Sequence, residues 1–251
     1  MSELSGDPFR LDDKIILVTG ASSGIGRATA LLCAELGATV WLTGRDPERL
    51  EETRSALSGC GHRVLVGDLK DPEFRQSLVD QLDSLDGFVF SAGVAELTPM
   101  RMVSEKHIES IFSINYSAPI LLTQRLLLRK KLNVGASLVY VTARAEHIAP
   151  LATGVYSAAK AALTASVRTL ALEHAKQGIR ANCVSPGYVE TPMLGKLQSV
   201  SSIQSKVDLA PLGILSADDI AQSISYLLLP ASRWITRTTL VVDAGLSLHV
   251  R

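Results

Sequence analysis

The chain has 251 residues, of which 47% are hydrophobic, so it is long enough for one large domain with a sizeable core. Its 25 basic and 25 acidic residues balance, which argues against a nucleic-acid-binding protein, because such a protein needs a basic face. No apolar run is long enough for a membrane-spanning helix, and the polar, acidic N-terminus is unlike a signal peptide.

The first predicted strand is followed by a glycine-rich turn and a helix. Residues 14–19, KIILVT, form a short β-branched apolar run, typical of a strand buried on both faces. Residues 20–26, GASSGIG, lead into an apolar-periodic helix that ends at Gly37. In such a unit the glycines let the backbone approach a pyrophosphate, and the helix N-terminus offers amide donors. The spacing differs from the commoner G-x-G-x-x-G, and a plain glycine-rich turn is the alternative interpretation.

Residues 38–43, ATVWLT, predict the second strand, and the turn after it carries a cation. In many dinucleotide-binding proteins a carboxylate near this point holds the ribose 2′-hydroxyl of NAD. Here Gly44 and Arg45 come first, so a 2′-phosphate would meet a cation and no competing acid. Asp46 is placed to cap the next helix, with Pro47 at the first helical position. Arg45 therefore favours NADP(H); the alternative is a solvated loop charge.

Strands and helices alternate through the rest of the chain. After the strand at 63–68 a helix is capped by Asp71, with Pro72 next. Further strands are predicted at 87–93, 137–143, 179–187 and 238–245, and helices at 104–130, 156–177 and 217–229. The pattern predicts a single domain over 1–251 with an α/β fold: a doubly wound, mostly parallel seven-stranded sheet with helices on both faces.

Tyr156 and Lys160 stand four residues apart at the start of a predicted helix, so both side chains lie on one face. A neighbouring cation favours the phenolate, so we expect Lys160 to lower the pKa of Tyr156 from about 10 toward working pH. Many surface helices contain such a pair by chance. The pair therefore gains weight only from the rest of the chain.

Several polar or glycine-rich segments follow strands, and ligands of such sheets bind outside the carboxyl ends of the strands. These segments are the turn at 20–26, residues 91–93, the stretch 138–160 and residues 185–193. They are expected to gather on one edge of the sheet. Asn115, in the apolar helix at 104–130, could belong to the same site or be a core amide satisfied by backbone groups.

The cysteines and histidines indicate neither a disulfide framework nor a metal site. Cys33, Cys60 and Cys183 are odd in number and form no CxxC pair, so reduced thiols in a cytoplasmic protein are the simplest interpretation. The five histidines are scattered without ligand spacing.

From about residue 10 to 247 the chain resembles the short-chain dehydrogenase/reductase (SDR) family. The motifs that carry the resemblance are TGASSGIG (19–26), Asp68, SAG (91–93), Asn115, YSAAK (156–160), SPG (185–187) and VETP (189–192). In this order and at these spacings they are highly specific. The resemblance implies a Rossmann fold, a nicotinamide cofactor, and hydride transfer between that cofactor and a carbonyl or alcohol.

The resemblance also implies roles for individual residues. Tyr156 would be the general acid in reduction and the base in oxidation, Lys160 would hold the nicotinamide ribose, and Asn115 would position a water. Arg45 would meet the 2′-phosphate, Asp68 and Leu69 the adenine. The implied cofactor-binding residues are Gly20, Ser22, Ser23, Gly24, Ile25, Gly26, Arg45, Asp68, Leu69, Ser91, Ala92, Gly93, Tyr156, Lys160, Pro186, Gly187, Val189 and Thr191.

One departure from the family falls in the catalytic stretch. The family usually has a serine thirteen positions before the tyrosine, where it hydrogen-bonds the substrate oxygen, and this chain has Ala143. Losing one such donor commonly costs about 10²- to 10³-fold in rate. Thr142 is adjacent but should face away, because successive strand residues point to opposite faces. Arg144 and His147 could serve instead, or be solvated loop residues.

Milder departures concern small residues. Ser91 stands where the family usually has asparagine, and Ala244 where it usually has a second glycine. Arg237 stands where a turn glycine is common, so the turn could be shifted. Residues 194–215 should form a substrate lid, whose composition indicates neither a steroid nor a strongly anionic substrate.

Three functions are compatible with this sequence. The first is an NADP(H)-dependent oxidoreductase acting on a small-molecule carbonyl or secondary alcohol, in the cytoplasm, as a homotetramer or homodimer. The second, which depends on Ala143, is a catalytically impaired nucleotide-binding sensor or scaffold. The third is a lyase or isomerase in which the tyrosine–lysine pair moves a proton while the cofactor stays bound. No metal, membrane or nucleic-acid partner is expected.

Overall fold

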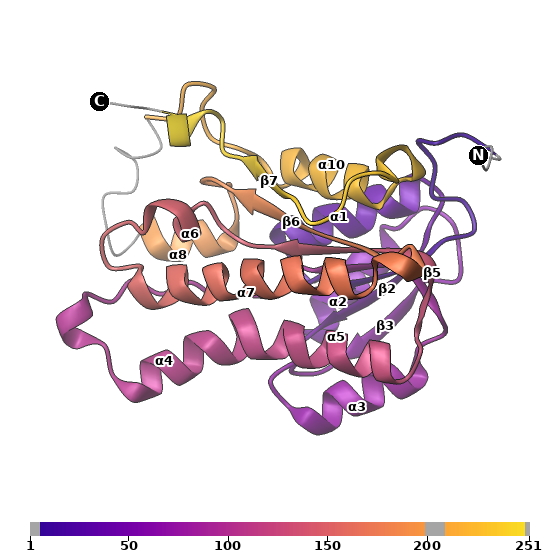
Figure 1. Ribbon diagram of the computed structural model, residues 1–251, viewed down its shortest axis with the longest axis horizontal. Helices are drawn as coiled ribbons and strands as arrows, with labels where there is room; N and C mark the ends of the chain where they lie inside the picture. Colours follow the sequence, from indigo (N-terminus) through magenta and orange to yellow (C-terminus); the bar gives the residue numbers. More distant parts are fainter. Residues whose placement is uncertain (1–5, 199–208, 249–251) are drawn as a thin grey trace.

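A seven-stranded sheet forms the centre of the protein (Figure 1). The computed structural model describes residues 6–198 and 209–248. The strand order is β3-β2-β1-β4-β5-β6-β7, and every neighbouring pair is parallel, as predicted for a doubly wound sheet. The strands are β1 Ile15–Thr19, β2 Thr39–Gly44, β3 Arg63–Val66, β4 Leu85–Phe90, β5 Leu132–Val141, β6 Arg180–Pro186 and β7 Thr239–Val242.

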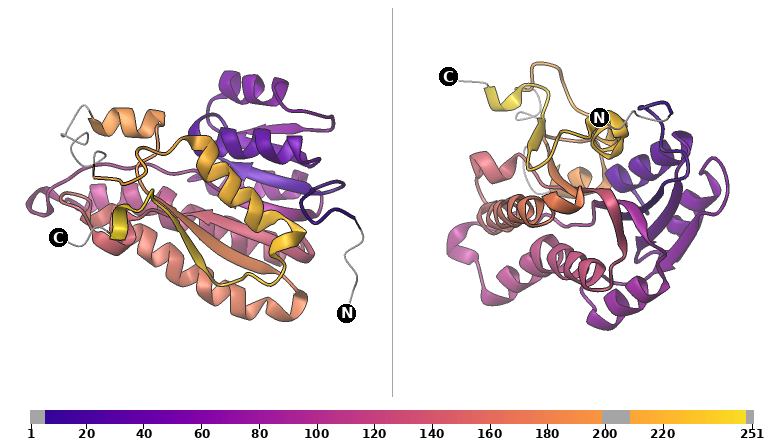
Figure 2. Two further views of the ribbon diagram at one scale, coloured as in Figure 1. Left: turned by 90° about the horizontal axis from the view of Figure 1, so that it is seen from above. Right: turned by 45° about the vertical axis from the view of Figure 1, so that its right-hand side comes forward.

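Helices cover both faces of the sheet, as the views in Figure 2 show. Helices α1, α2 and α10 pack on one face, and α3, α5 and α7 on the other. The helices are α1 Gly24–Glu35, α2 Pro47–Ser55, α3 Pro72–Gln81, α4 Glu105–Phe112, α5 Ala118–Leu128, α6 Ala145–Ile148, α7 Gly154–Glu173, α8 Pro192–Gln198 and α10 Ala217–Leu228. None of the described helices is long and apolar enough to cross a membrane.

Two apolar cores, one on each face, explain why the strands are apolar without alternation. In β1, Ile16 and Val18 belong to the core beneath α1 and α10, whereas Leu17 belongs to the core beneath α5 and α7. Successive strand residues point to opposite faces, and here both faces are covered by helices. A strand in this position must therefore be apolar at every residue.

The predicted caps fix where two helices begin. The Asp46 carboxylate accepts a hydrogen bond from the Arg49 amide at 3.1 Å, at the start of α2. The Asp71 carboxylate accepts one from the Glu73 amide at 2.9 Å, at the start of α3. Each cap satisfies an amide that has no partner inside its helix.

Some predicted boundaries are wrong. The strand predicted at 137–143 begins earlier, at Leu132, and ends at Val141. The helix predicted at 104–130 is interrupted by a π-helical turn, Ser113–Ser117, between α4 and α5. The helix predicted to run to residue 177 ends at Glu173, and a 3-10 turn follows it. The predicted lid, 194–215, falls partly on residues 199–208, which lie outside the described residues.

At two positions where the family usually has glycine, the backbone adopts the conformation that glycine favours. Arg237 and Ala244 have φ of 63° and 56°, in the left-handed region that favours glycine. The turn at Arg237 keeps its place at the start of β7, since the Arg237 amide donates to the Ala181 carbonyl at 2.9 Å. Both residues therefore store backbone strain of about 1 kcal/mol each.

Candidate active site

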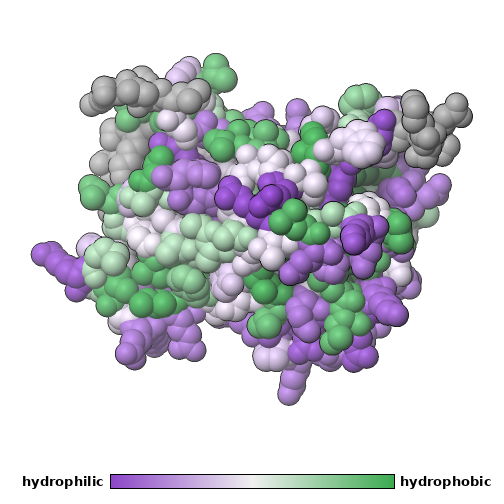
Figure 3. Space-filling view, in the orientation of Figure 1, coloured by the Kyte–Doolittle hydropathy of each residue, from purple (hydrophilic) through white to green (hydrophobic). Residues whose placement is uncertain are grey.

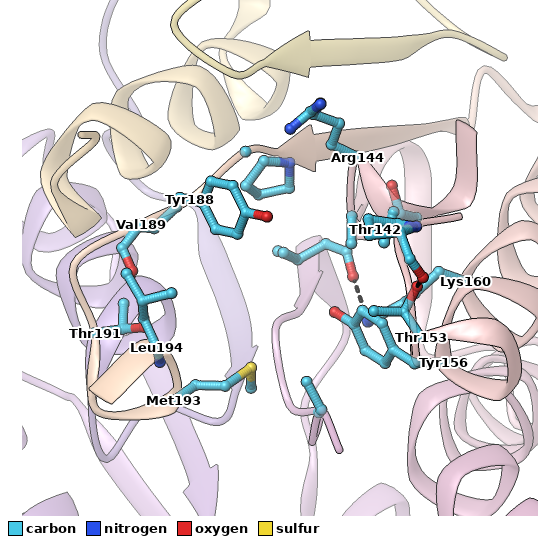
Figure 4. Close-up of a pocket in the computed structure, with 18 of the residues that line it drawn as sticks. Thr142, Arg144, Thr153, Tyr156, Lys160, Tyr188, Val189, Thr191, Met193 and Leu194 are labelled. Carbon is cyan, nitrogen blue, oxygen red and sulfur yellow. Dashed lines mark hydrogen bonds between the residues drawn. The ribbon is translucent and has the colours of Figure 1, made fainter. Parts of the chain in front are cut away.

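The segments predicted to gather at one edge of the sheet do so, around two cavities. The first cavity lies between the β5–α7 stretch and residues 186–194 (Figure 4). Tyr156 and Lys160 line it on one side, and Tyr188 and Val189 on the other. Ala143 also lines it. Its remaining walls are largely apolar.

The second cavity extends over the glycine-rich turn and the ends of β2 and β3. It is lined by Gly20, Ser22, Ser23, Gly24, Ile25, Arg45, Asp68, Leu69, Ser91, Ala92, Gly93 and Thr191, all of which were predicted to bind the cofactor, together with residues that were not predicted, such as Lys70 and Ile114. Ile25, Ser91, Gly93 and Thr191 line both cavities. The two are therefore parts of one groove, which runs from Arg45 to Tyr156.

Two predicted residues, Gly26 and Asn115, line neither cavity. A Cβ at Gly26 would overlap the Gly20 carbonyl oxygen, so this glycine serves the close packing of α1 against the turn. A Cβ at Gly20 would lie 2.9 Å from the Ala92 backbone, so Gly20 lets two backbone segments approach each other. These glycines allow the close packing of the backbone segments that support the groove.

The start of α1 is suited to an anion. Its N-cap residue, Ser23, makes no side-chain cap, and its first turn has no acidic residue. The first amides of a helix have no partner inside the helix and carry the positive end of its dipole. Because Ser23, Gly24 and Ile25 at the start of α1 line the groove, this end of the helix fits the pyrophosphate of a dinucleotide.

Two cations line the outer end of the groove. Arg45 follows β2 and forms no ion pair with any residue in the described part of the chain. Its neighbour Asp46 is engaged with Arg49, both as a cap and through an ion pair of 3.4 Å. Lys70 follows β3, and its ammonium lies 3.8 Å from the Asp68 carboxylate. Arg45 was predicted from the sequence, and Lys70 could have been noticed two residues after the Asp68 motif.

Tyr156 and Lys160 lie on one face of α7, as predicted; Lys160 is buried and Tyr156 is partly buried. The Lys160 ammonium is 5.8 Å from the centre of the Tyr156 ring and donates to the Val141 carbonyl at 2.9 Å (Figure 4). Only 4% of Lys160 is exposed. The Val141 carbonyl at the end of β5 therefore fixes the ammonium behind the phenol.

The predicted lowering of the Tyr156 pKa is wrong for this structure. Burial raises the pKa of Tyr156 above its ordinary value, and the Glu146 carboxylate raises it further. Burial lowers the pKa of Lys160 to about 8, while Glu146 raises it. Burial therefore disfavours the charged form of both groups more than their proximity favours it.

Glu146 is a buried carboxylate that the sequence reasoning missed. Its side chain is 2% exposed and accepts a hydrogen bond of 2.6 Å from the Thr164 hydroxyl, which joins α6 to α7. Its other oxygen lies 3.0 Å from His147. Burial raises the pKa of Glu146. The signal in the sequence was an acidic residue between Ala143 and Tyr156, but only the fold shows that it is buried.

Asn115 lies in the π-helical turn between α4 and α5. Its amide nitrogen donates to the carbonyls of Ile111 and Val94, each at 2.9 Å. Its amide oxygen is buried and has no partner in the described structure, and a Cβ at Gly93 would lie 2.8 Å from it. Asn115 is thus a core amide on its nitrogen side, with an unsatisfied acceptor on the side of Gly93.

The position of the missing serine is open to the first cavity, because Ala143 lines it. The neighbouring Thr142 is 3% exposed, and its hydroxyl donates to the Val184 carbonyl at 3.2 Å. The Thr142 hydroxyl is therefore bound to β6, but Thr142 also lines the first cavity, whereas the alternation of strand side chains predicted that it faces away.

Arg144 is held in place and is not a solvated loop residue. Its side chain is 14% exposed, lies 3.6 Å from the Asp243 carboxylate and donates to the Ser247 hydroxyl at 3.1 Å. His147 is more exposed, at 41%, and its ring faces Glu146. Within the described residues no cluster of His, Cys, Asp or Glu could hold a metal ion.

Comparison with known proteins connects this geometry to chemistry. Residues 20–247 match a family model described as enoyl-(acyl carrier protein) reductase. A glucose 1-dehydrogenase from Gluconobacter oxydans is 34% identical over 253 residues, covering 96% of this chain and 94% of that protein. A cis-4-hydroxycyclohexanecarboxylate dehydrogenase from Sinomonas cyclohexanicum is 31% identical, covering 93% of this chain and 96% of that protein.

Solved structures with the same fold include a short-chain dehydrogenase/reductase, a glucose/ribitol dehydrogenase, from Brucella melitensis. It superposes with a TM-score of 0.88 at 28% identity, covering 95% of this chain and 98% of that one. A candidate 2-deoxy-d-gluconate 3-dehydrogenase from Agrobacterium tumefaciens was solved with NADP bound. Its TM-score is 0.86 at 26% identity, and the match covers 97% of this chain and 100% of that one.

Proposed function

Because the chain belongs to the short-chain dehydrogenase/reductase family of oxidoreductases, we propose that it transfers a hydride between NADP(H) and a small carbonyl or secondary alcohol. The observation that carries the proposal is the shared wall of the two cavities. Ile25, Ser91 and Gly93 line both the second cavity, which fits a dinucleotide, and the first cavity, which holds Tyr156. A nicotinamide in this groove would therefore lie beside the phenol.

The residues of the first cavity supply the acid–base part of the reaction. When bound, NADPH would supply the hydride that goes to the carbonyl carbon. The Tyr156 hydroxyl donates its proton to the carbonyl oxygen, and the product is an alcohol. Because burial raises the Tyr156 pKa, the phenol keeps its proton at neutral pH, as an acid must. Lys160 holds the cofactor ribose and stabilises the phenolate left after transfer.

Two residues support this pair. Asn115 would hold a water through its unsatisfied amide oxygen, next to Gly93, so that the proton lost by Tyr156 is replaced from solvent through Lys160. Glu146 places a negative charge near Lys160 and favours its ammonium form. Substrate would enter the first cavity beside Met193 and Leu194, which line it.

A preference for NADP(H) over NAD(H) is supported by Arg45 and Lys70 in the groove, with Asp46 turned to Arg49. A 2′-phosphate would meet two cations there. Arg45→Asp should therefore lose most of its NADPH-induced melting shift and keep its NADH-induced shift. Equal melting shifts of the native protein with NADPH and NADH would contradict a preference for NADP(H). Lys176→Asp, at an exposed position in the turn after α7 and away from both cavities, is the control for a general loss of positive charge.

The direct test follows NADPH oxidation with aliphatic, alicyclic and aromatic aldehydes and ketones. Native protein should oxidise NADPH with at least one of them, and Tyr156→Phe should lose about 10²-fold or more while still binding NADPH. A Tyr156→Phe variant with unchanged turnover would refute the role of the phenol. If the native protein oxidises NADPH with none of these carbonyl compounds, the reductase function is refuted.

A second function is kept because of Ala143. A nucleotide-binding sensor or scaffold of the same fold would bind NADPH tightly and not turn over. It would also stay inactive in Ala143→Ser. Turnover by the native protein excludes it.

We also propose a homodimer or homotetramer that uses α5 and α7. Leu121 and Leu128 of α5 and Leu172 of α7 are exposed, at 42%, 69% and 57%. Figure 3 shows apolar residues across the middle of this face, over α7, and hydrophilic residues along its lower edge. Light scattering of the native protein and of Leu128→Glu measures the oligomeric state, and a native monomer would contradict the proposal.

A further inference from the structure

Ala143 leaves the first cavity without the hydroxyl that the family uses to hold the substrate oxygen. A carbonyl oxygen gains negative charge as hydride arrives, and a donor aimed at it stabilises that charge. Besides Tyr156 and Lys160, the side-chain donors that line this cavity belong to Ser91, Thr142, Arg144, Thr153, Tyr188 and Thr191. Ser91 and Thr191 also line the second cavity, which leaves Thr142, Thr153, Arg144 and Tyr188 as candidates.

Both threonine hydroxyls are already used as donors. Thr142 donates to the Val184 carbonyl at 3.2 Å, and Thr153 donates to the Pro150 carbonyl at 2.6 Å. A hydroxyl has one proton, so neither can donate to a substrate without giving up its present bond. Both bonds fix the chain around Ala143.

The Arg144 side chain already interacts with residues outside the cavity. Its guanidinium donates to the Ser247 hydroxyl and lies near the Asp243 carboxylate. In Figure 4 the guanidinium points away from the Tyr156 ring. It lies above the cavity, where it contacts the segment after β7.

Tyr188 differs from these three residues. Figure 4 shows its hydroxyl pointing into the cavity from the wall opposite Tyr156, whose hydroxyl points toward it. The hydroxyl donates to no residue in the described ranges 6–198 and 209–248. Burial raises the pKa of Tyr188, so the phenol keeps the proton it would donate.

Hydrogen bonds hold the backbone on both sides of Tyr188, so the point from which its side chain extends is fixed. The Gly187 amide donates to the Val242 carbonyl at 2.9 Å, and the Leu215 amide donates to the Tyr188 carbonyl at 3.2 Å. A bridge between Val189 and Leu215 follows directly. A Cβ at Gly187 would lie 2.9 Å from Asp243, so only glycine lets this segment pass so close to the end of β7.

We propose that Tyr188 donates the hydrogen bond to the substrate oxygen that a serine at position 143 would otherwise donate, an inference that rests on the proposed function. Tyr156 transfers its proton to the oxygen from one side of the cavity, and Tyr188 stabilises the same oxygen from the other. A phenol is longer than a serine hydroxymethyl group, which suits a donor on the opposite wall. On this assignment the chain is an active enzyme whose donor stands at position 188 instead of position 143.

The test uses the panel carbonyl that the native protein reduces fastest. Tyr188→Phe removes the hydroxyl and keeps the ring, and we expect kcat to fall about 10²-fold, with NADPH binding and melting temperature unchanged. Tyr226→Phe, on α10 and away from both cavities, is the matched control and should keep native turnover. Ala143→Ser should raise native kcat by less than about threefold, because the role is already filled, but should restore most of the loss in Tyr188→Phe.

Different results identify different failures. If native turnover is normal and Tyr188→Phe keeps its kcat, or loses only in KM, the assignment of Tyr188 is wrong and the reductase function stands. If Ala143→Ser alone raises native kcat about 10²-fold, the native site has no donor and the assignment is wrong. If the native protein reduces no carbonyl, the proposed function fails and the Tyr188 assignment fails with it.

Discussion

Replacing Lys160 by methionine should change how stability depends on pH, because the native site holds an ammonium in a buried place. Burial lowers the pKa of Lys160 from its ordinary 10.5 to about 8. Each pKa unit corresponds to about 1.4 kcal/mol, so the buried charge destabilises the native fold by about 3 kcal/mol. That is a large part of a typical unfolding free energy.

The sign follows from proton counts. Between pH 8 and 10.5 the unfolded chain binds a proton at Lys160 that the folded chain does not bind, so folding becomes more favourable as pH rises. The destabilisation is complete below pH 8 and absent above 10.5. A neutral amine still donates to the Val141 carbonyl, so that hydrogen bond contributes little to the difference.

The assay is urea unfolding of the cofactor-free protein, followed by tryptophan fluorescence at a series of pH values. Native protein should gain about 3 kcal/mol relative to Lys160→Met as pH rises from 8 to 10.5. Lys106→Met, at an exposed position of α4, is the control and should follow the native curve. Parallel curves for native protein and Lys160→Met would show that the ammonium is not buried at this cost.

Three further predictions concern neighbouring features. Glu146→Gln removes the carboxylate that raises the Lys160 pKa, so the alkaline fall in turnover, expected near pH 8 in native protein, should move to lower pH in the pH–rate profile; an unmoved profile would exclude coupling. Gly93→Ala places a Cβ 2.8 Å from the buried Asn115 oxygen and should destabilise the fold by about 1–3 kcal/mol in urea unfolding; an unchanged unfolding free energy would contradict this prediction. Ser216→Ala breaks the capping box of α10 and should cost about 1 kcal/mol in the same assay; a loss near zero would mean that the cap is unimportant.

The sheet could be predicted from the sequence because its physical causes are local. Uninterrupted apolar strands such as 14–19 indicate burial on both faces, and both faces are covered by helices. Asp46 and Asp71 stand directly before prolines, which marks the start of a helix, and both cap α2 and α3 as expected. The glycine-rich turn was placed by the same kind of local signal.

What could not be predicted depends on contacts between distant residues. Spacing alone placed Tyr156 beside Lys160, but the direction of the Tyr156 shift follows from burial, which no spacing reveals. Glu146 becomes part of the site only because α6 packs on α7 at Thr164.

Backbone detail was also out of reach. The π-helical turn at Ser113–Ser117 has no local signal, yet it sets the direction of the Asn115 amide. The early start of β5 at Leu132 depends on pairing with Leu85 across an irregularity in the ladder. Neither follows from the order of residues within its own segment.

The most direct test of the proposed hydride transfer uses NADPH in which both hydrogens at the nicotinamide C4 position are replaced by deuterium. Native protein is incubated with this cofactor and the panel of aldehydes and ketones, and the alcohols formed are analysed by mass spectrometry. We predict an alcohol with deuterium at the former carbonyl carbon, formed by native protein and formed about 10²-fold or more slowly by Tyr156→Phe. NADPH binding without any labelled alcohol would contradict the assignment of this chain as an oxidoreductase of carbonyl compounds.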